Sequence, residues 1–212
     1  MLLDDFESQL CPSERILLDG LNKPDRIQSY LNEVPYSEDE FYRCPLRVLR
    51  DRKAHCFDGA LFAAMVLRRF GHPSVILELI PNARDDDHVL ALYKYSGFWG
   101  AVAQSNFTGL RYREPVYRSL RELVMSYFED FFNSLGEKTL VGYRGPINLK
   151  GFDPLNWMTS DAGLETLSNE MDRYCIHPVI SPEMADNLAL ADERSLRAGL
   201  LGANQTGLFK VK

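Results

Sequence analysis

The sequence predicts an α+β fold in which one buried helix packs on a small antiparallel sheet. Residues 57–70 are apolar on nearly every side, which is typical of a buried helix. The run SVILELI, residues 74–80, is β-branched and aliphatic and predicts a central strand. Two more apolar runs, 88–94 and 98–104, flank a Tyr-Ser-Gly turn and predict a β-hairpin.

Short helices are expected before the buried helix. Residues 24–33 carry apolar side chains at helical spacing, and Pro35 ends that segment. Residues 45–53 combine apolar and basic side chains and predict a surface helix or loop. Gly71 stops the buried helix, because glycine tolerates the backbone conformation that follows a helix end.

After the hairpin, residues 114–133 predict an amphipathic helix. Its apolar face would comprise Val116, Leu120, Leu123, Val124, Tyr127, Phe128 and Phe131. Residues 136–160 are rich in Gly and Pro and predict loop with one or two short strands, and 161–201 return to helix. We therefore expect a core over 1–135, followed by a loop and helical extension over 136–212 that belongs to the same domain.

Composition and charge exclude several classes of protein. Of 212 residues, 45% are hydrophobic and 25% are charged, which disfavours disordered, collagen-like and coiled-coil chains. The net charge of −6 would repel a nucleic-acid backbone. The longest apolar stretch, 59–67, is too short to cross a bilayer, and the acidic start MLLDDFESQL does not resemble a secretory signal. We expect a cytoplasmic protein with no membrane or nucleic-acid partner, and its four cysteines, which form no CxxC pair, should be reduced.

The candidate nucleophile is Cys56, which stands at the mouth of the buried helix. The positive end of the helix dipole and the unpaired amides of 56–58 would lower the pKa of this thiol and could hold an oxyanion. His88 opens a later strand, which lets the helix mouth and the strand edge meet. The pair would act as an activated nucleophile with His88 as base and then acid.

A third group should orient the His88 ring. Pairing across the hairpin turn brings residues 104–106 opposite His88, and this stretch holds Gln104, Ser105 and Asn106. A neutral amide can fix a histidine tautomer, so Asn106 is favoured and Gln104 is the alternative.

The same residues resemble the transglutaminase-like superfamily over about 22–106. The likeness rests on AHCFDGALFAAMVLRRFGHPSVILEL, on the strand HVLALYK and on Trp99 of GFWGAV. It implies a papain-like core with Cys56 heading a helix and His88 opening a strand. In the family an aspartate commonly follows the tryptophan by four residues, and here that position is Ala103. The resemblance leaves three alternatives open: the site is fully active, it uses an amide as its third member, or it has lost activity.

Other polar residues near the hairpin have simpler explanations. Residues 85–87 are three aspartates, which predict a solvated turn rather than a metal site, and no metal or cofactor is expected. Their charge, that of Asp87 above all, would raise the pKa of His88. Arg111 is a candidate for orienting an anionic substrate, and Trp99 and Gln104 are candidates for lining the substrate site.

The predicted function is cysteine-dependent acyl transfer, with hydrolysis of an amide or peptide favoured over cross-linking. The substrate would be a peptide, a protein or a small amide. The alternative is an inactive transglutaminase-like module that keeps the fold for binding or as a scaffold, because Ala103 replaces the orienting acid.

Overall fold

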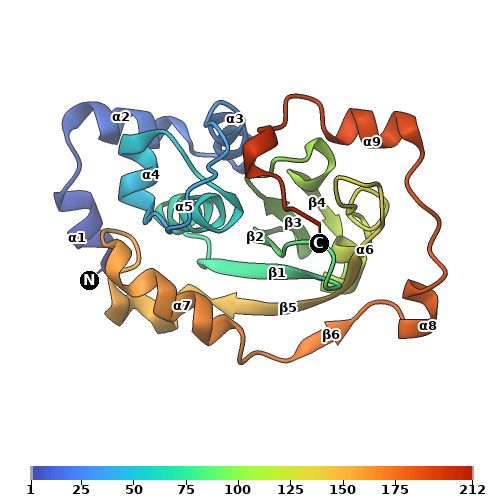
Figure 1. Cartoon of the computed structure of the whole chain (residues 1–212). Coiled ribbons are helices and arrows are strands. Elements are labelled where there is room, and N and C mark those ends of the chain that lie inside the picture. Colours follow the sequence, from blue (N-terminus) through green and yellow to red (C-terminus); the bar gives the residue numbers. More distant parts are fainter. Residues whose placement is uncertain (1, 212) are drawn as a thin grey trace.

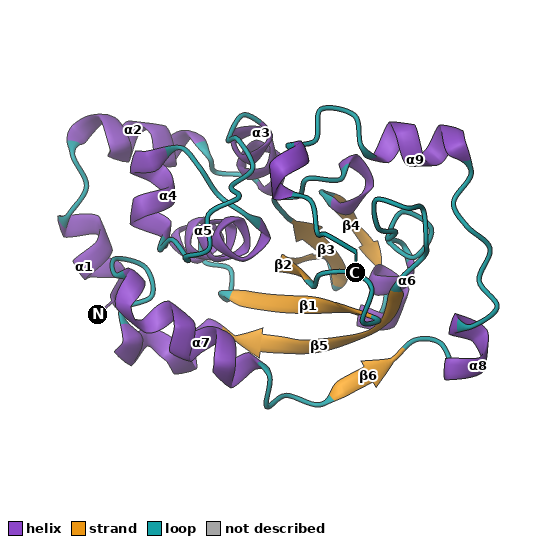
Figure 2. Ribbon diagram, in the orientation of Figure 1, coloured by secondary structure: helices purple, strands orange, loops and turns teal. Residues whose placement is uncertain are grey.

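A computed structural model describes residues 2–211, and its centre is a six-stranded sheet (Figures 1 and 2). The strands are β1 (Val75–Pro81), β2 (His88–Tyr95), β3 (Phe98–Val102), β4 (Arg113–Tyr117), β5 (Leu140–Asn148) and β6 (Ile176–Pro178). Their order is β4-β3-β2-β1-β5-β6, and every neighbouring pair is antiparallel. The predicted combination of helix and antiparallel sheet is confirmed, although the sheet is larger than expected.

The helices lie on both sides of this sheet. They are α1 (Leu2–Ser8), α2 (Pro12–Gly20), α3 (Pro24–Asn32), α4 (Pro45–Asp51), α5 (Cys56–Arg69), α6 (Leu120–Met125), α7 (Leu164–Met171), α8 (Pro182–Ala185) and α9 (Glu193–Gly199). Figure 1 shows α1 to α4 gathered around α5. No helix within 2–211 is both long and apolar enough to cross a bilayer.

Helix α5 is the buried helix that the sequence predicts. Its residues from Cys56 to Leu67 are all buried, and it ends where Gly71 adopts φ +83°. It shares one core with strand residues such as Val89 and Ala91. Helix α4 also packs against α5 and buries its apolar side chains, so the segment expected at the surface is largely internal.

The prediction of one helix over residues 114–133 is wrong. The chain forms edge strand β4, and then Ser119 caps the short helix α6 by accepting a hydrogen bond from the Glu122 N–H. Pro115 is compatible with β4 because an edge strand does not need every backbone donor. The helical spacing of apolar residues therefore came from a strand, a short helix and a turn in succession.

The chain after residue 135 contributes to the same sheet. Strand β5 pairs along β1 from Val75, opposite Asn148, to Pro81, opposite Leu140. Residues 161–201 are only partly helical, because β6 and the loops around α8 interrupt them (Figure 2). The red end of the chain in Figure 1 then returns to the region of β2 and α5.

Candidate functional site

Cys56 lines a cleft of about 540 Å³ between the loop 36–42, the start of β2, α7 and the segment 206–209. The charged side chains along this cleft are acidic. Among the described residues its walls carry no lysine or arginine, and its carboxylates are Glu38, Asp39, Glu40, Glu78, Asp86, Asp87 and Glu165. The space around the thiol therefore favours cationic or neutral groups over anions.

The Cys56 sulfur lies against the backbone at the beginning of β2. It is 3.9 Å from the Asp87 carbonyl oxygen, and the Val89 N–H also points at it. This approach is available because the pairing of β2 with β3 begins only at Ala91. The sulfur consequently sits between the two residues that flank His88.

The thiol is nevertheless neutral in this state. Burial raises the pKa of Cys56 well above its ordinary value, and the carboxylates of Asp87 and Asp86 raise it further. The Val89 N–H acts in the opposite direction but does not compensate. The expectation of a lowered pKa is wrong here, because desolvation and negative charge outweigh the dipole of α5.

The first amides of α5 are already engaged. Nδ1 of His55 accepts a hydrogen bond from the Phe57 N–H at 3.1 Å, and the Asp58 carboxylate accepts one from the His55 N–H at 3.4 Å. Burial, followed by the charge of Arg43, lowers the pKa of His55 to about 4. His55 is thus a neutral helix cap, and the Phe57 amide is not free to hold an oxyanion.

His88 is buried, and its ring lies on the far side of β2. Side chains alternate along a strand, so Val89 and Ala91 pack with α5 while Leu90 joins the opposite core. His88 is two residues before Leu90, so its side chain points to the same side of β2 as that of Leu90. Its Nε2 lies 2.7 Å from the Leu110 carbonyl oxygen. Burial lowers the pKa of His88 to about 4. The prediction that Asp87 raises the pKa of His88 is wrong. Burial has the largest effect on that pKa, and the Asp87 carboxyl lies beside Glu78 instead.

The structure does not bring the Cys56 sulfur and the His88 ring, the pair predicted from the sequence, into contact. Within 2–211, no hydrogen bond links the Cys56 sulfur to the His88 ring. His88 lines a separate cavity of about 50 Å³ that adjoins the Cys56 cleft. Both cavities share Tyr36, Asp86, Asp87 and the segment 207–209 as walls. Cys56 and His88 therefore face two neighbouring cavities, and the shared wall residues form a partition between them.

Asn106 binds a distant segment and does not contact the His88 ring through any hydrogen bond in the described part of the chain. Its Oδ1 accepts from the Asn204 N–H at 2.7 Å, and its Nδ2 donates to the Asn204 carbonyl at 2.8 Å. The group that holds His88 is the backbone carbonyl of Leu110, which a sequence pattern cannot reveal because every residue has one.

Gln104 has a structural position beside α5. Its Nε2 donates to the Val34 carbonyl at 2.6 Å. A Cβ placed on Gly59 would lie 2.3 Å from the Cβ of Gln104, so the glycine allows the end of β3 to approach the helix.

Trp99 and Arg111 also lie outside the Cys56 cleft. Trp99 is at the other end of the hairpin from His88, where the Lys94 ammonium lies 4.1 Å from its ring centroid. The Arg111 guanidinium donates to the Ser105 carbonyl at 3.1 Å and to Asn32 at 3.3 Å. Neither residue lines the cleft that holds the thiol.

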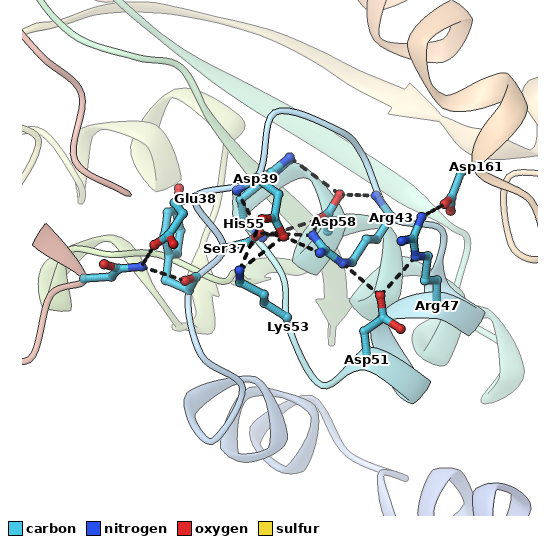
Figure 3. Close-up of polar contacts among 12 residues, drawn as sticks. Ser37, Glu38, Asp39, Arg43, Arg47, Asp51, Lys53, His55, Asp58 and Asp161 are labelled. Atoms are coloured by element: carbon cyan, nitrogen blue, oxygen red, sulfur yellow. Dashed lines mark hydrogen bonds and ion pairs between the residues drawn. The ribbon is translucent and has the colours of Figure 1, made fainter. Parts of the chain in front are cut away.

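Sequence reasoning missed a buried charge network around Arg43 (Figure 3). The Arg43 guanidinium contacts Asp39, Asp51 and Ser37, and the Arg43 backbone N–H donates to the Asp58 carboxylate at 2.7 Å. Burial raises the pKa of Asp58 to about 7. The network fixes the loop that forms one cleft wall, and the available signal was a single acid inside an otherwise apolar helix.

The three consecutive aspartates are largely used to shape their own turn. The Asp85 carboxylate accepts from the Asp86 N–H and from the Thr139 hydroxyl, and the Asp86 carboxylate accepts from the Asp87 N–H. In the described residues, no group of three or more His, Cys, Asp or Glu side chains is arranged to hold a metal ion.

Comparison with known proteins gives a weak structural likeness. No protein-family model matches the sequence, and no curated protein matches it. Two solved structures of Legionella pneumophila LapG, the first of them EGTA-treated, are similar, with 15% and 16% identity and TM-scores of 0.35 and 0.36. Each match covers 49% of this chain and 68% of LapG. The fold description therefore rests on the helices and the antiparallel sheet themselves.

Proposed function

We propose that the protein is a cysteine-dependent amide or peptide hydrolase of the transglutaminase-like kind, with Cys56 as nucleophile and His88 as base and acid. The observation that carries this proposal is the position of the sulfur between Asp87 and Val89, the neighbours of His88. The resemblance of residues 22–106 to the transglutaminase-like superfamily supports the same pair.

The Leu110 carbonyl gives His88 a defined tautomer. A carbonyl oxygen only accepts, so Nε2 of the neutral ring carries the proton and Nδ1 keeps its lone pair. In the proposed reaction the His88 ring leaves the Leu110 carbonyl, its unprotonated Nδ1 takes the Cys56 proton, and the sulfur bonds to the acyl carbon. The C–N bond then breaks, and the leaving amine receives the proton from His88. Water then attacks the thioester carbon and gives one proton to the same ring. The C–S bond breaks, the acid leaves, and the ring returns the proton to the sulfur, which restores the thiol.

This chemistry requires a change from the described state. The His88 ring must pass around the end of β2 to reach the Cys56 sulfur. His88 is the first residue of that strand, where the backbone pairs with Leu79 of β1 but not with β3, so the movement takes place at a strand end that is held on one side. The ring would then add a positive charge beside the sulfur when it takes the proton, which favours the thiolate.

Capture by an electrophilic acyl probe tests the nucleophile. We expect the probe to form a thioester at Cys56 and Cys56→Ala to remove the adduct, while the matched variant Cys175→Ala, at an exposed cysteine, keeps it. An adduct confined to Cys11 or Cys175 would contradict the proposal, because those thiols react through exposure alone.

A second candidate function is ligand binding without catalysis, which the raised pKa of Cys56 and the engaged Phe57 amide favour. The acidic cleft would then take a cationic ligand. A diamine that stabilises both the wild type and Cys56→Ala against heat, with no acyl-probe capture, would support this candidate over the hydrolase.

A further inference from the structure

Residues 204–209, which we call the closing segment, run from the α9 side of the molecule to the Cys56 cleft. Asn106 binds the backbone N–H and C=O of Asn204 together. The Asn204 side chain donates to the Tyr36 carbonyl at 3.1 Å and to the Glu38 carboxylate at 2.6 Å. Thr206 also donates its hydroxyl to Glu38 (Figure 3 labels Glu38).

The next residues of the closing segment separate the two cavities. A Cβ on Gly207 would lie 3.2 Å from the Tyr36 ring, so the backbone passes directly over that side chain. Leu208 and Phe209 line both the Cys56 cleft and the His88 cavity. The closing segment therefore stands with Tyr36 in the partition between the thiol and the imidazole.

The contacts of this segment have the chemistry of peptide recognition. A side-chain amide that binds the N–H and C=O of one residue recognises peptide main chain, and Asn204 has an extended backbone (φ −70°, ψ 108°) where Asn106 binds it. A short 3-10 turn, Gln205–Gly207, follows, and Leu208 is extended again. Glu38 and the Tyr36 carbonyl bind the Asn204 side chain, and Phe209 lines the Cys56 cleft. The contacts between Asn106 and the cleft thus suit a peptide with one tight turn.

We propose that the closing segment is an intramolecular occupant of a peptide-binding groove, and that a substrate peptide reaches Cys56 only after displacing it. The proposal rests on the proposed hydrolase function and adds a substrate class, a peptide with one tight turn, and a means of control. Departure of residues 207–209 would also join the two cavities and open the route between His88 and Cys56.

The closing segment is attached weakly enough to leave the groove and return. Every residue of the closing segment is half-buried or exposed, so leaving the groove uncovers no fully buried side chain of its own. Just before it, Gly202 adopts φ +73°, which gives the chain a turn that few other residues accept. The segment is therefore held by side-chain hydrogen bonds and partial packing rather than by a buried core.

Alkylation of Cys56 in the full-length chain tests this arrangement. The first variant, Asn204→Ala with Thr206→Ala, removes the bonds to Glu38. The second, Leu208→Asp with Phe209→Asp, places carboxylates beside Asp86 and Asp87 in the partition. We expect iodoacetamide to label Cys56 about tenfold faster in each variant, as expected when local opening becomes easier. Asn187→Ala, an exposed amide at the end of α8, is the matched control and should leave the rate unchanged.

Cys44 serves as an internal standard for unfolding. It is 3% exposed, lies in the core near α4, and is not a wall of the Cys56 cleft. Faster labelling of Cys56 with slow labelling of Cys44 supports the proposal. A synthetic ANQTGLFKV peptide, which reproduces residues 203–211, should then slow Cys56 labelling again in both variants.

Unchanged Cys56 labelling in both variants overturns the proposal, and so does labelling that rises only together with that of Cys44. The test does not depend on turnover. Fast, selective labelling with no acyl-probe capture would retain the closing segment as an occupant and reject the hydrolase, so the two failures are distinguishable.

Discussion

The sulfur of Cys56 lies 3.9 Å from the carbonyl oxygen of Asp87, the residue immediately before His88. The backbone thus brings the thiol to the point in the chain where the sequence expects its imidazole partner. The ring itself points to the other face of β2 and binds the Leu110 carbonyl. The described state therefore places the Cys56 thiol beside the start of β2, while the His88 imidazole is close along the chain but turned away from it.

The pH dependence of Cys56 alkylation should show a raised pKa. Because burial and nearby carboxylates disfavour the thiolate, the rate should keep rising from pH 7 to pH 9.5. The labelling rate of an ordinary cysteine would reach half its maximum near the usual thiol pKa of ~8.5 and bend towards a plateau by pH 9.5. Iodoacetamide labelling with peptide mass analysis gives the profile, and a plateau below pH 8 would show that the thiol is activated instead.

His88 should not titrate in the usual histidine range. Its pKa of about 4 means that the ring stays neutral in the folded protein, whereas in the unfolded chain it gains a proton near pH 6.5. Stability from this site is therefore present above pH 6.5 and is lost as the pH falls from there towards 4. NMR of the ring protons should show the His88 signals fixed from pH 7.5 to 5, and movement of those signals in that range contradicts the burial of the ring.

Asp87→Asn should stabilise the protein at pH 8 and have little effect at pH 4. Enclosure by the cleft walls and the Glu78 carboxyl raise the pKa of Asp87, so its charged form is disfavoured in the folded state. Stability is therefore lost as the pH rises above the ordinary aspartate pKa, and the amide removes that loss. Because Asp87 borders open solvent, we expect a gain on the order of 1 kcal/mol or less. Thermal unfolding at both pH values, with Asp186→Asn as control, measures it; equal effects at the two values would show that charge is not the cause.

Arg43→Met should destabilise the protein strongly. Asp58 is completely buried, and Arg43 is the cation beside it, so the variant leaves a buried acid without its partner. We expect a loss of about 3 kcal/mol in unfolding free energy at pH 8, and a smaller loss at pH 5, where Asp58 can be protonated. Arg173→Met, which breaks an exposed ion pair with Glu170, should cost less than about 1 kcal/mol. Urea unfolding of both variants decides the matter, and similar losses would mean that the network is not important for stability.

Gly59→Ala should disturb the contact between α5 and the end of β3. The new Cβ would lie 2.3 Å from the Cβ of Gln104, so the strand end must shift at a cost of about 1–3 kcal/mol. Gly20→Ala at the end of α2 meets open space and is the control. If urea unfolding finds both variants equally stable, the close approach is not required.

The sequence predicted those parts of the fold that have one dominant local pattern. Helix α5 is apolar nearly all round, β1 is β-branched and aliphatic, and β2 and β3 are apolar runs on either side of a glycine turn, so local pattern and tertiary structure agree. The segment 114–133 misled because apolar residues of an edge strand and a short helix happened to fall at helical spacing. One or two short strands were expected within 136–160, but the length of β5 was hidden because its Gly and Pro residues resemble those of a loop.

The site was harder to predict than the fold for a physical reason. Strand β2 is buried on both faces, so its apolar run has no alternation to show which way His88 points. The contact between Asn106 and Asn204 joins residues that are far apart in the chain and leaves no periodic signal. The placement of Cys56 at the start of a helix depended only on local pattern, and this is the part of the site that the structure reproduces.

The most direct test of the hydrolase account is the dependence of Cys56 acylation on His88. The rate of thioester formation with an acyl probe at pH 7 should fall at least about a hundredfold in His88→Ala, the scale of general base catalysis, and should be unchanged in His72→Ala. A His88→Ala protein that folds normally and acylates Cys56 at the wild-type rate would contradict the account.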